Sequence, residues 1–464
     1  MSEKQSSREE RRALGKAARA RVPLEEHGVF EPAPDRDPLG LLLGQAESRV
    51  PELVPIRHER MLVSPFTFFR GAALPMAADL AGTPTSGFRV QLCGDAHLSN
   101  FGGFASPGRR LVFDINDFDE TIPGPFEWDV KRLAASLVVA GRDNGFTDEE
   151  CRAVALAGAH SYRTAMREFA GLSTLDVWYA HLDFEDVVRD LRSQLAKRGR
   201  KMAAKAVAKA RARDSLQALD KLTTVVDGRH RITSDPPLIV PVEDLFTELD
   251  TDALYAQLND LLDGYAQTLQ SDRRHLIRQF ALVHVARKVV GVGSVGTRAW
   301  VLLLDAGDGR EPLFLQAKEA QASVLADYCG RSRHAHEGER VVAGQRLMQA
   351  ASDIFLGWQS TTGPDGIARD FYVRQLRDWK VSAPVEVMLP QGMRAYAGLC
   401  GWTLARGHAR SGDRIAMAAY LGKTDAFDVA VADFADAYAN QNEADHAAFT
   451  GAVADGLAES VAPA

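Results

Sequence analysis

Five oxygen-bearing side chains gather within a short stretch of this sequence, and their types and spacing suit metal and phosphate chemistry. Asp95 and Asn100 lie on a loop opened by Gly94. Carboxylates held close together raise one another's pKa, and a hard cation relieves that repulsion. Residues 91–133 therefore predict a site for magnesium and phosphate. The remaining members of the group, at the end of an apolar, strand-like run, are Asp114, Asp117 and Asp119.

A second candidate for phosphate chemistry is a glycine-rich segment later in the chain. Its G-x-G-x-x-G pattern occurs in both dinucleotide-binding folds and kinase phosphate loops. A dinucleotide fingerprint opens a helix, but residues 297–304 are β-branched and apolar, which predicts a strand. A glycine loop between two strands, followed on the next strand by Lys318, is the kinase arrangement. The alternative is an ordinary glycine-rich hairpin with an exposed lysine. The loop residues expected to contact a nucleotide are Gly291, Gly293, Ser294 and Gly296.

The elements that must position these residues follow from apolar periodicity. Residues 88–92 predict the strand that delivers the Asp95 loop, and residues 128–141 predict a helix buried on all sides. Asp129, in the first turn of that helix, is expected to favour the helix N-terminus electrostatically or to hold neighbouring backbone amides. Further helices are predicted at 76–80, 147–169, 184–218, 250–287, 322–328, 338–352 and from 394 onward, and further strands at 297–304, 312–320 and 370–380.

Two basic segments raise the question of phosphate or nucleic-acid contact. Arg57, Arg60 and Arg70 flank an aromatic-rich segment and could reach a phosphate, although an exposed helix edge explains them equally well. Residues 197–214 are rich in lysine and arginine, and a solvated helix face is the favoured interpretation. The net charge of −7 also argues against a dedicated nucleic-acid binder.

Length and composition limit the class of protein. A chain of 464 residues can bury more than one core, since single cores stop growing at roughly 250–300 residues. With 46% hydrophobic and 25% charged residues, the composition is that of an ordinary soluble protein. The four cysteines are scattered, which suits a reducing compartment. The first residues lack the apolar core of a signal peptide, and no run of about 18 apolar residues occurs. We therefore expect a cytoplasmic protein without a membrane span.

Three motifs carry a resemblance to a known group of enzymes. GDAHLSN (94–100) resembles the catalytic loop of aminoglycoside and choline kinase-like phosphotransferases. DFDE (117–120) resembles their metal-binding motif, and WD (128–129) resembles the buried motif that follows it. More closely, GDAHLxNFG, NDFDE and WDxKRLA resemble those of the bacterial domain-of-unknown-function family 2252 (DUF2252), whose name implies no activity.

The kinase resemblance implies roles for single residues. Asp95 would accept the proton of the attacking hydroxyl, and Asn100 and Asp117 would hold magnesium. Asp119 is a candidate for a second metal contact, with Asp114 as a further candidate for either metal role. Lys318 would contact the α- and β-phosphates of ATP and pair with a carboxylate on the next helix. The candidates for that carboxylate are Glu339 and, after it, Glu337.

The sequence departs from the kinase pattern in the order of its motifs. In those kinases the glycine loop and lysine precede the catalytic loop, whereas here they follow it. Either the glycine loop is a coincidence or the fold is circularly permuted, and we favour permutation. Residues 397–410 resemble the helix that leads into the catalytic loop. Cys93 also replaces the usual histidine before Gly94, and His97 within the loop could contact phosphate or be structural.

Three other functions compete with phosphoryl transfer. A two-metal phosphoesterase could use Asp95, His97, Asn100, Asp114 and Asp117, but the later histidines lack the settings that such sites need. A non-catalytic module could bind nucleotide alone, and the same fold can transfer AMP when ATP binds in the opposite orientation. Cys329, His334 and His336 match no strong zinc pattern.

The sequence therefore predicts an α+β protein with a two-lobed protein kinase-like fold, in which a mainly helical large lobe meets a small antiparallel-sheet lobe. It would transfer a phosphoryl group from Mg-ATP to a hydroxyl, of a small molecule rather than a protein. Its expected parts are an N-terminal tail or arm (1–49), the large lobe (50–284), the small lobe (285–385) and C-terminal helices that complete the large lobe (386–464). Polar residues that could line the cleft are Arg340, Arg346, Arg374, Tyr438, Gln441 and Asp445.

Overall fold

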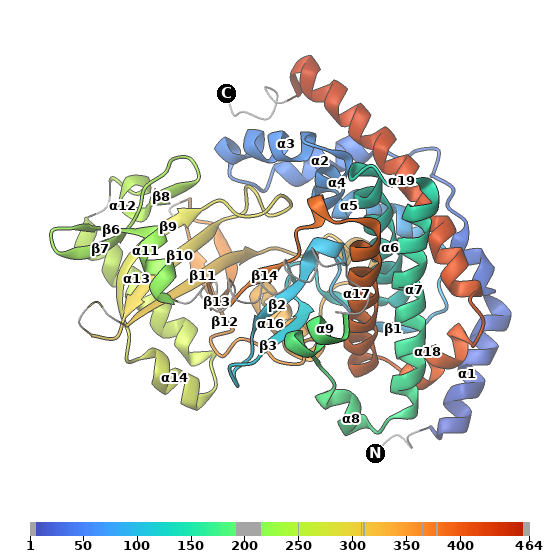
Figure 1. The fold of residues 1–464 in the computed structure, drawn as a ribbon. Helices are drawn as coiled ribbons and strands as arrows, with labels where there is room; N and C mark the ends of the chain where they lie inside the picture. Colours follow the sequence, from blue (N-terminus) through green and yellow to red (C-terminus); the bar gives the residue numbers. More distant parts are fainter. Residues whose placement is uncertain are drawn as a thin grey trace.

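The computed structural model describes residues 6–191, 215–248, 250–307, 309, 311–363, 365–376 and 379–457. They form an α+β fold with antiparallel sheets. Figure 1 shows a part rich in strands beside a part made mainly of helices, with short strands between them.

The first part is built on a six-stranded antiparallel sheet in the order β12-β13-β11-β10-β9-β8. A β-hairpin and four helices accompany it. The strands and helices of this part are β6 (Thr223–Val226), β7 (Arg229–Ile232), β8 (Ile239–Pro241), β9 (Ala281–Lys288), β10 (Ala299–Asp305), β11 (Pro312–Ala320), β12 (Gly357–Thr362), β13 (Ala368–Gln375), α11 (Ser215–Leu222), α12 (Val242–Leu245), α13 (Thr251–Gln267) and α14 (Ser271–Ile277).

Both faces of this sheet are covered, which explains the continuous apolar run of β10. Val301 and Leu303 of β10 pack in a cluster with the apolar face of α11. Leu302 and Leu304 point the other way, into the cluster made with α13 and α14. Side chains alternate along a strand, so an apolar run buries itself only between two layers.

The second part is a set of helices around α6 (Phe126–Asp143), which is buried nearly all round. Helices α4, α7, α17 and α19 pack against it. The other helices of this part are α1 (Arg8–Arg21), α2 (Pro38–Ala46), α3 (Val54–Leu62), α4 (Pro65–Gly71), α5 (Ala73–Ala81), α7 (Asp148–Gly171), α8 (Thr174–Tyr179), α9 (Phe184–Leu191), α15 (Ala326–Cys329), α16 (Glu337–Met348), α17 (Pro390–Ser411), α18 (Arg414–Leu421) and α19 (Ala426–Ala452).

Short strands carry the loops of the acidic stretch. They form a β1-β4 pair and a β14-β2-β3-β5 sheet, all antiparallel. Short 3₁₀ or π turns at 24–28, 51–53, 98–100, 385–387 and 453–457 complete the fold. The strands are β1 (Arg89–Leu92), β2 (Phe101–Ala105), β3 (Leu111–Ile115), β4 (Ile122–Pro125), β5 (Leu182–Asp183) and β14 (Val381–Ser382).

Most predicted elements exist, including the strand before Asp95, the buried helix at 128–141 and the antiparallel β10–β11 hairpin. Residues 281–287 were wrongly expected to continue a helix, and together with Lys288 they form β9. The reason is pairing, because β9 lies between β8 and β10 and its β-branched Val283 and Val285 suit a sheet. The sheet thus begins at β8, before the expected boundary at residue 285. Residues 197–214 lie outside the described residues.

The N-terminal segment is packed rather than a frayed tail. Gly15 of α1 lies so close to α18 that an added Cβ would come within 2.1 Å of the Ala416 carbonyl oxygen. Arg11 of the same helix forms an ion pair with Asp413 at 2.7 Å. Arg36, further along the arm, bridges Asp79 and Asp445. Small residues on an alanine-rich helix permit close packing that composition alone does not reveal.

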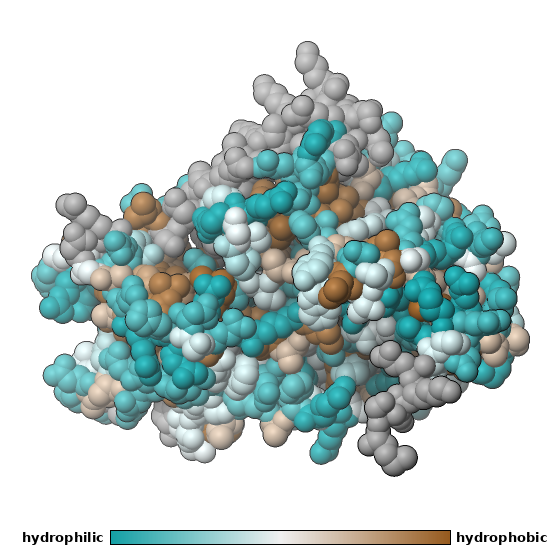
Figure 2. Space-filling model, turned by 90° about the horizontal axis from the view of Figure 1, so that it is seen from below, coloured by the Kyte–Doolittle hydropathy of each residue, from teal (hydrophilic) through white to brown (hydrophobic). Residues whose placement is uncertain are grey.

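Among the described residues, no helix has both the length and the apolar character needed to cross a bilayer. Figure 2 shows one face on which hydrophilic residues predominate and hydrophobic residues form small, separate groups.

Candidate active site

The Asp95 loop is held from beneath by the first turn of α6. The Asp129 carboxylate accepts hydrogen bonds from the backbone N–H groups of Cys93 (2.8 Å) and Gly94 (3.1 Å). Gly94 has a φ of +86°, and a Cβ there would lie 2.2 Å from the Glu120 carbonyl oxygen. Asp129 thus takes the second of its two expected roles, and glycine is required where the two acidic loops touch.

Asp95 itself is oriented by a residue that the sequence interpretation missed. The Nε of Arg132, on α6, donates to Asp95 Oδ1 at 2.5 Å, and His97 Nε2 lies 3.6 Å from Oδ2. Burial raises the pKa of Asp95, although the Arg132 guanidinium opposes the shift. Burial and the nearby guanidinium groups of Arg70 and Arg132 lower the pKa of His97 well below its usual range. A neutral His97 therefore sits beside Asp95.

Lys318 of β11 reaches the acidic loop after β3. Its Nζ lies 2.5 Å from Asp119 Oδ2 and 3.6 Å from Asp117 Oδ1. Tyr372, on the neighbouring strand β13, donates to the other Asp119 oxygen at 2.5 Å. Burial would lower the pKa of Lys318, but the two carboxylates outweigh it and raise that pKa, so the ammonium group is charged.

Asp117 and Asp119 differ in how their oxygens are used. Both oxygens of Asp119 are engaged, by Lys318 and Tyr372. Oδ1 of Asp117 is buried and has no hydrogen-bond partner. Burial raises the pKa of Asp117, but the charges of Lys318, Arg374 and Lys380 outweigh that effect and the pKa is lowered. Asp117 is thus an ionised carboxylate with an unsatisfied oxygen.

Three expected acidic residues belong elsewhere. Glu339 does not pair with Lys318: it lies in the first turn of α16, 3.5 Å from His334, and its side chain is 39% exposed. Glu337 pairs with Arg340. The carboxylates of the Asp117 loop occupy the position beside Lys318 instead, because β11 faces that loop directly. Asp114 points away from Lys318, into a buried ion pair with Arg406 of α17 at 2.6 Å.

The glycine loop joins the antiparallel neighbours β9 and β10, as the pattern predicts. Gly291 (φ +69°) and Gly296 (φ +91°) adopt backbone conformations that favour glycine. Residues near the N-terminus hold the carbonyl groups of this loop. Arg60 donates a hydrogen bond to the Gly291 carbonyl at 2.5 Å, and the Val50 N–H donates to the Gly296 carbonyl at 2.8 Å. Arg49 also donates to the Val295 carbonyl.

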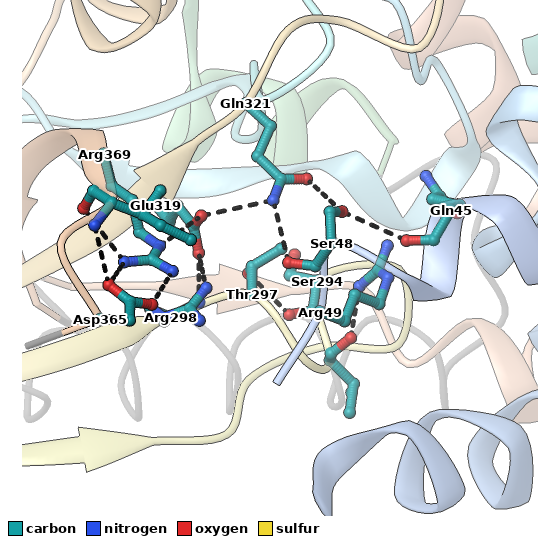
Figure 3. Close-up of polar contacts among 12 residues, drawn as sticks. Gln45, Ser48, Arg49, Ser294, Thr297, Arg298, Glu319, Gln321, Asp365 and Arg369 are labelled. Atoms are coloured by element: carbon teal, nitrogen blue, oxygen red, sulfur yellow. Dashed lines mark hydrogen bonds and ion pairs between the residues drawn. The ribbon is translucent and has the colours of Figure 1, made fainter. Parts of the chain in front are cut away.

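A polar chain continues this attachment to the sheet, as Figure 3 shows. Ser48 Oγ donates to Gln321, and the Gln321 amide donates to Glu319 at 3.3 Å. Glu319 in turn pairs with Arg298 at 3.2 Å and Arg369 at 3.8 Å. Residues 45–60 therefore position the glycine loop relative to the strands on either side of Lys318.

Two adjoining cavities lie where these loops meet. The larger has a volume of about 810 Å³, within the usual range for ligand pockets, and the smaller about 120 Å³. Gly296, Glu339 and Asp114 line neither. Predicted site residues that line the larger one are Asn100, Asp117, Gly291, Ser294 and Lys318. Those that line the smaller one are Asp95, Asn100, Asp117, Asp119, Gly291, Gly293 and Ser294.

The larger cavity is lined by more basic than acidic residues, the acidic ones being Asp117, Asp353 and Glu386, and it has an apolar portion. Leu276, Phe280 and Phe355 form part of the apolar portion. A cavity of this character suits an anion attached to an apolar or aromatic group. Its basic residues are Arg70, Arg109, Lys288, Lys318, Arg374 and Lys380.

The residues expected to line the cleft divide into two groups. Arg374 lines the larger cavity and donates to the Asn116 carbonyl at 3.0 Å. Arg340 lines neither cavity, but it donates to the Thr121 and Asp119 carbonyls and so fixes the acidic loop. The others serve packing elsewhere: Arg346 binds the Leu356 carbonyl, and Tyr438, Gln441 and Asp445 belong to the network around Arg36 and Asp79.

Within the described part of the chain, no group of three or more His, Cys, Asp and Glu side chains could hold a metal ion. A magnesium ion bound with a nucleotide needs fewer protein ligands, because phosphate oxygens and water supply the rest. Asn100 Nδ2 donates to the Asp95 carbonyl at 2.8 Å, which leaves the amide oxygen as the available donor atom. With the unsatisfied Asp117 oxygen, the residues present fit magnesium.

No curated protein and no solved structure gives a significant match to this chain. One family model does match, over residues 49–452, and its description is "Uncharacterized protein conserved in bacteria (DUF2252)". The matched region contains the Asp95 loop, the acidic loop, the glycine loop and Lys318. Since it covers most of the 464 residues, the chain belongs to this bacterial family.

Proposed function

We propose that this protein is an ATP-dependent phosphotransferase with a circularly permuted kinase-like fold. It would transfer a phosphoryl group from Mg-ATP to a hydroxyl, of a small molecule rather than a protein, in the cytoplasm. The proposal goes beyond family membership, which carries no activity of its own.

One observation carries it: Lys318 lies 2.5 Å from Asp119 although the two are 199 residues apart in sequence. The glycine loop next to this lysine lines the same two cavities as Asn100 and Asp117. A phosphate cradle, a lysine, two oxygen ligands for magnesium and a carboxylate for the acceptor thus converge. Phosphoryl transfer relies on this kind of positioning and charge stabilisation.

Helix α17 supports the permutation. It is the helix whose sequence resembles the element leading into the catalytic loop, yet it follows that loop in the chain. Its end lies against β1, where Ser411 Oγ accepts a hydrogen bond from Gln91 N–H at 3.1 Å. Tyr396, on the same helix, donates to the Leu98 and Phe101 carbonyls at 2.9 Å. The spatial order of helix and loop thus suits a kinase although the chain order does not.

The residues have distinct tasks in the proposed reaction. Asp95, held by Arg132, accepts the proton as the acceptor oxygen bonds to the γ-phosphorus and the bond to the bridging oxygen of ADP breaks. Asn100 and Asp117 would hold magnesium, which when bound neutralises charge on the phosphates. Lys318 binds the α- and β-phosphates, with Asp119 and Tyr372 fixing its ammonium group. The glycine loop lets backbone N–H groups approach the phosphates.

The contacts of Asp114 favour this proposal over a two-metal phosphoesterase. That alternative needs Asp114 as a ligand, but its oxygens accept hydrogen bonds from Arg406 and from Ala350 N–H. Among the described residues, no comparable contact favours AMP transfer or nucleotide binding without catalysis, and the acceptor screen described below distinguishes AMP transfer from phosphoryl transfer.

The test measures thermal stability with Mg-ATP for wild type, Asp117→Asn and Lys318→Met. A ligand that binds only the folded state at a hundredfold excess over its Kd adds about 2.7 kcal/mol of stability. We expect a magnesium-dependent rise in Tm for wild type and little rise for either variant. Lys423→Ala, at an exposed position outside both cavities, serves as the control. The Tm of each variant without ligand shows whether it is folded.

Three results would argue against the proposal. No shift in wild type would leave the protein without a nucleotide site. A shift that survives Lys318→Met would separate the glycine loop from that site. AMP joined to the acceptor, rather than phosphate, in a screen of hydroxyl compounds would favour the reversed orientation of ATP.

A further inference from the structure

Three arginines near the N-terminal helices have different surroundings. Arg57 is fully buried and donates to Gln45 and the Gly71 carbonyl, so it serves packing. Arg60 holds the glycine loop through the Gly291 carbonyl. Arg70 forms no hydrogen bond or ion pair with any residue that the structure describes, and its buried Nε has no partner. Its guanidinium lies 6.0 Å from the Phe66 ring centroid.

Arg70 occupies the place where the two cavities meet. Asp95, which would face the acceptor hydroxyl, lines only the smaller cavity, and Lys318 lines only the larger. A group passing from nucleotide to acceptor must lie between them. Among the described residues, Arg70 is the cation that lines both cavities. The complete set that lines both is Arg70, Asn100, Asp117, Gly291 and Ser294.

The backbone under Arg70 is firmly held. It lies in the last turn of α4, whose start is fixed by a capping box between Ser64 and Thr67 and whose Phe68 and Phe69 are buried. The glycine loop packs onto this turn, since a Cβ on Gly293 would lie 3.1 Å from the Arg70 carbonyl oxygen. Arg70 therefore approaches the glycine loop and the acidic loops from a rigid helix.

Three carboxylates keep the Arg70 guanidinium charged in spite of its burial. Burial lowers the pKa of its guanidinium, and the carboxylates of Asp95, Glu386 and Asp117 counteract that effect. The side chain keeps its charge, since arginine is effectively always protonated in proteins. A planar guanidinium with several N–H donors matches phosphate geometry.

We propose that Arg70 binds the γ-phosphoryl group of ATP and stays with it during transfer. This inference rests on the proposed phosphotransferase function and adds a residue to it. The three equatorial oxygens of the transferred group share negative charge in the transition state. Arg70 would neutralise that charge from the side opposite Lys318, which serves the α- and β-phosphates. Replacing Arg70 should therefore weaken the binding of a nucleoside triphosphate far more than that of a diphosphate.

The test compares the Kd values of Mg-AMPPNP and Mg-ADP by calorimetry, for the full-length protein. We expect Arg70→Ala to raise the Kd of Mg-AMPPNP at least about tenfold, as the loss of a charged hydrogen bond does. The Kd of Mg-ADP should rise less than about twofold. The Kd of Arg70→Lys for Mg-AMPPNP should lie between those of wild type and Arg70→Ala.

Two control variants accompany the measurement. Arg60→Ala should weaken the binding of both nucleotides to the same extent, because Arg60 contacts the glycine loop. Arg167→Ala, an exposed arginine outside both cavities, should change neither.

The outcomes separate this inference from the function on which it rests. Equal weakening of both nucleotides in Arg70→Ala, or no weakening, overturns the inference while nucleotide binding by wild type stands. Failure of wild type to bind either nucleotide overturns both proposals. If Arg70→Ala has a low Tm without ligand, Arg70→Lys and Arg70→Gln provide the comparison in variants that retain more of the side chain than alanine does.

Discussion

Two pairs of acidic residues between positions 95 and 129 lie in different regions and satisfy their oxygens differently. Asp114 and Asp129, each 1% exposed, face the helices and are fully engaged, by Arg406 and by the amides of the Asp95 loop. Asp117 and Glu120 face the cavities. Asp117 has an oxygen with no hydrogen-bond partner, and Glu120 accepts a hydrogen bond from Val324 N–H at 2.7 Å.

The difference sets Asp117, at the cavities, apart from Asp114 and Asp129. An unpartnered oxygen is not sufficient by itself, because Glu127 Oε2 also has no hydrogen-bond partner although Glu127 lines neither cavity. A buried carboxylate without a full set of partners is costly, so a fold keeps one only where a ligand or function compensates. Residue type does not distinguish the two pairs, because all four are carboxylates and Asp114 is only three residues from Asp117. Three measurements would break or sharpen the distinction.

The largest change in the free energy of unfolding is expected when the buried Asp114–Arg406 ion pair is broken. Asp114→Ala leaves a buried guanidinium without its counter-charge, and breaking such a pair costs about 3–5 kcal/mol. The matched variant Asp117→Ala should cost less than about 1 kcal/mol, because its ion pair is 3.6 Å long and partly exposed. Denaturant unfolding of both variants without ligand measures the contrast. Equal losses would erase the distinction between the two regions.

An intermediate effect is expected from the pH dependence of Glu120. Burial raises the pKa of this carboxyl from 4.5 to about 7, so the folded state holds its proton more tightly than the unfolded chain. The contribution of Glu120 to the free energy of unfolding is fully present below pH 4.5 and is lost as the pH rises through about 7.

The free energy of unfolding at pH 5 and pH 8 tests this expectation. Wild type should lose up to about 3 kcal/mol more than Glu120→Gln over that interval. Glu339→Gln, at an exposed glutamate, should follow wild type. A Glu120→Gln profile that runs parallel to wild type would show that Glu120 is an ordinary, ionised surface residue.

The smallest effect should come from Glu339, the residue first expected to pair with Lys318. Glu339→Ala should change the free energy of unfolding by less than about 0.5 kcal/mol, since its partner His334 is partly exposed and 3.5 Å away. It should also leave the Mg-ATP shift in Tm unchanged. A loss of that shift would return Glu339 to the nucleotide site and would require the fold to close differently around ATP.

Local pattern was enough for most of the elements. The helix at 128–141 followed from its apolar run, and the β10–β11 hairpin followed from β-branched residues, glycines and a turn. The place of Asp129 in a first helical turn left two roles open, and the structure shows the acceptor role for backbone amides. These features depend on interactions between near neighbours in the chain, which sequence spacing encodes directly.

The arrangement of the site came only from tertiary structure. Lys318 was expected to pair with a glutamate on the next helix, but the sheet brings it to Asp119 from a distant part of the chain. Arg132 looks like an ordinary helical arginine, yet it orients Asp95. Of the three arginines considered for phosphate contact, Arg70 is the one that lines both cavities. Such contacts depend on how separate elements pack, and a helical or strand pattern specifies which face is buried but not what it meets. The sequence by itself therefore determined which groups could do chemistry, and packing decided which of them face one another.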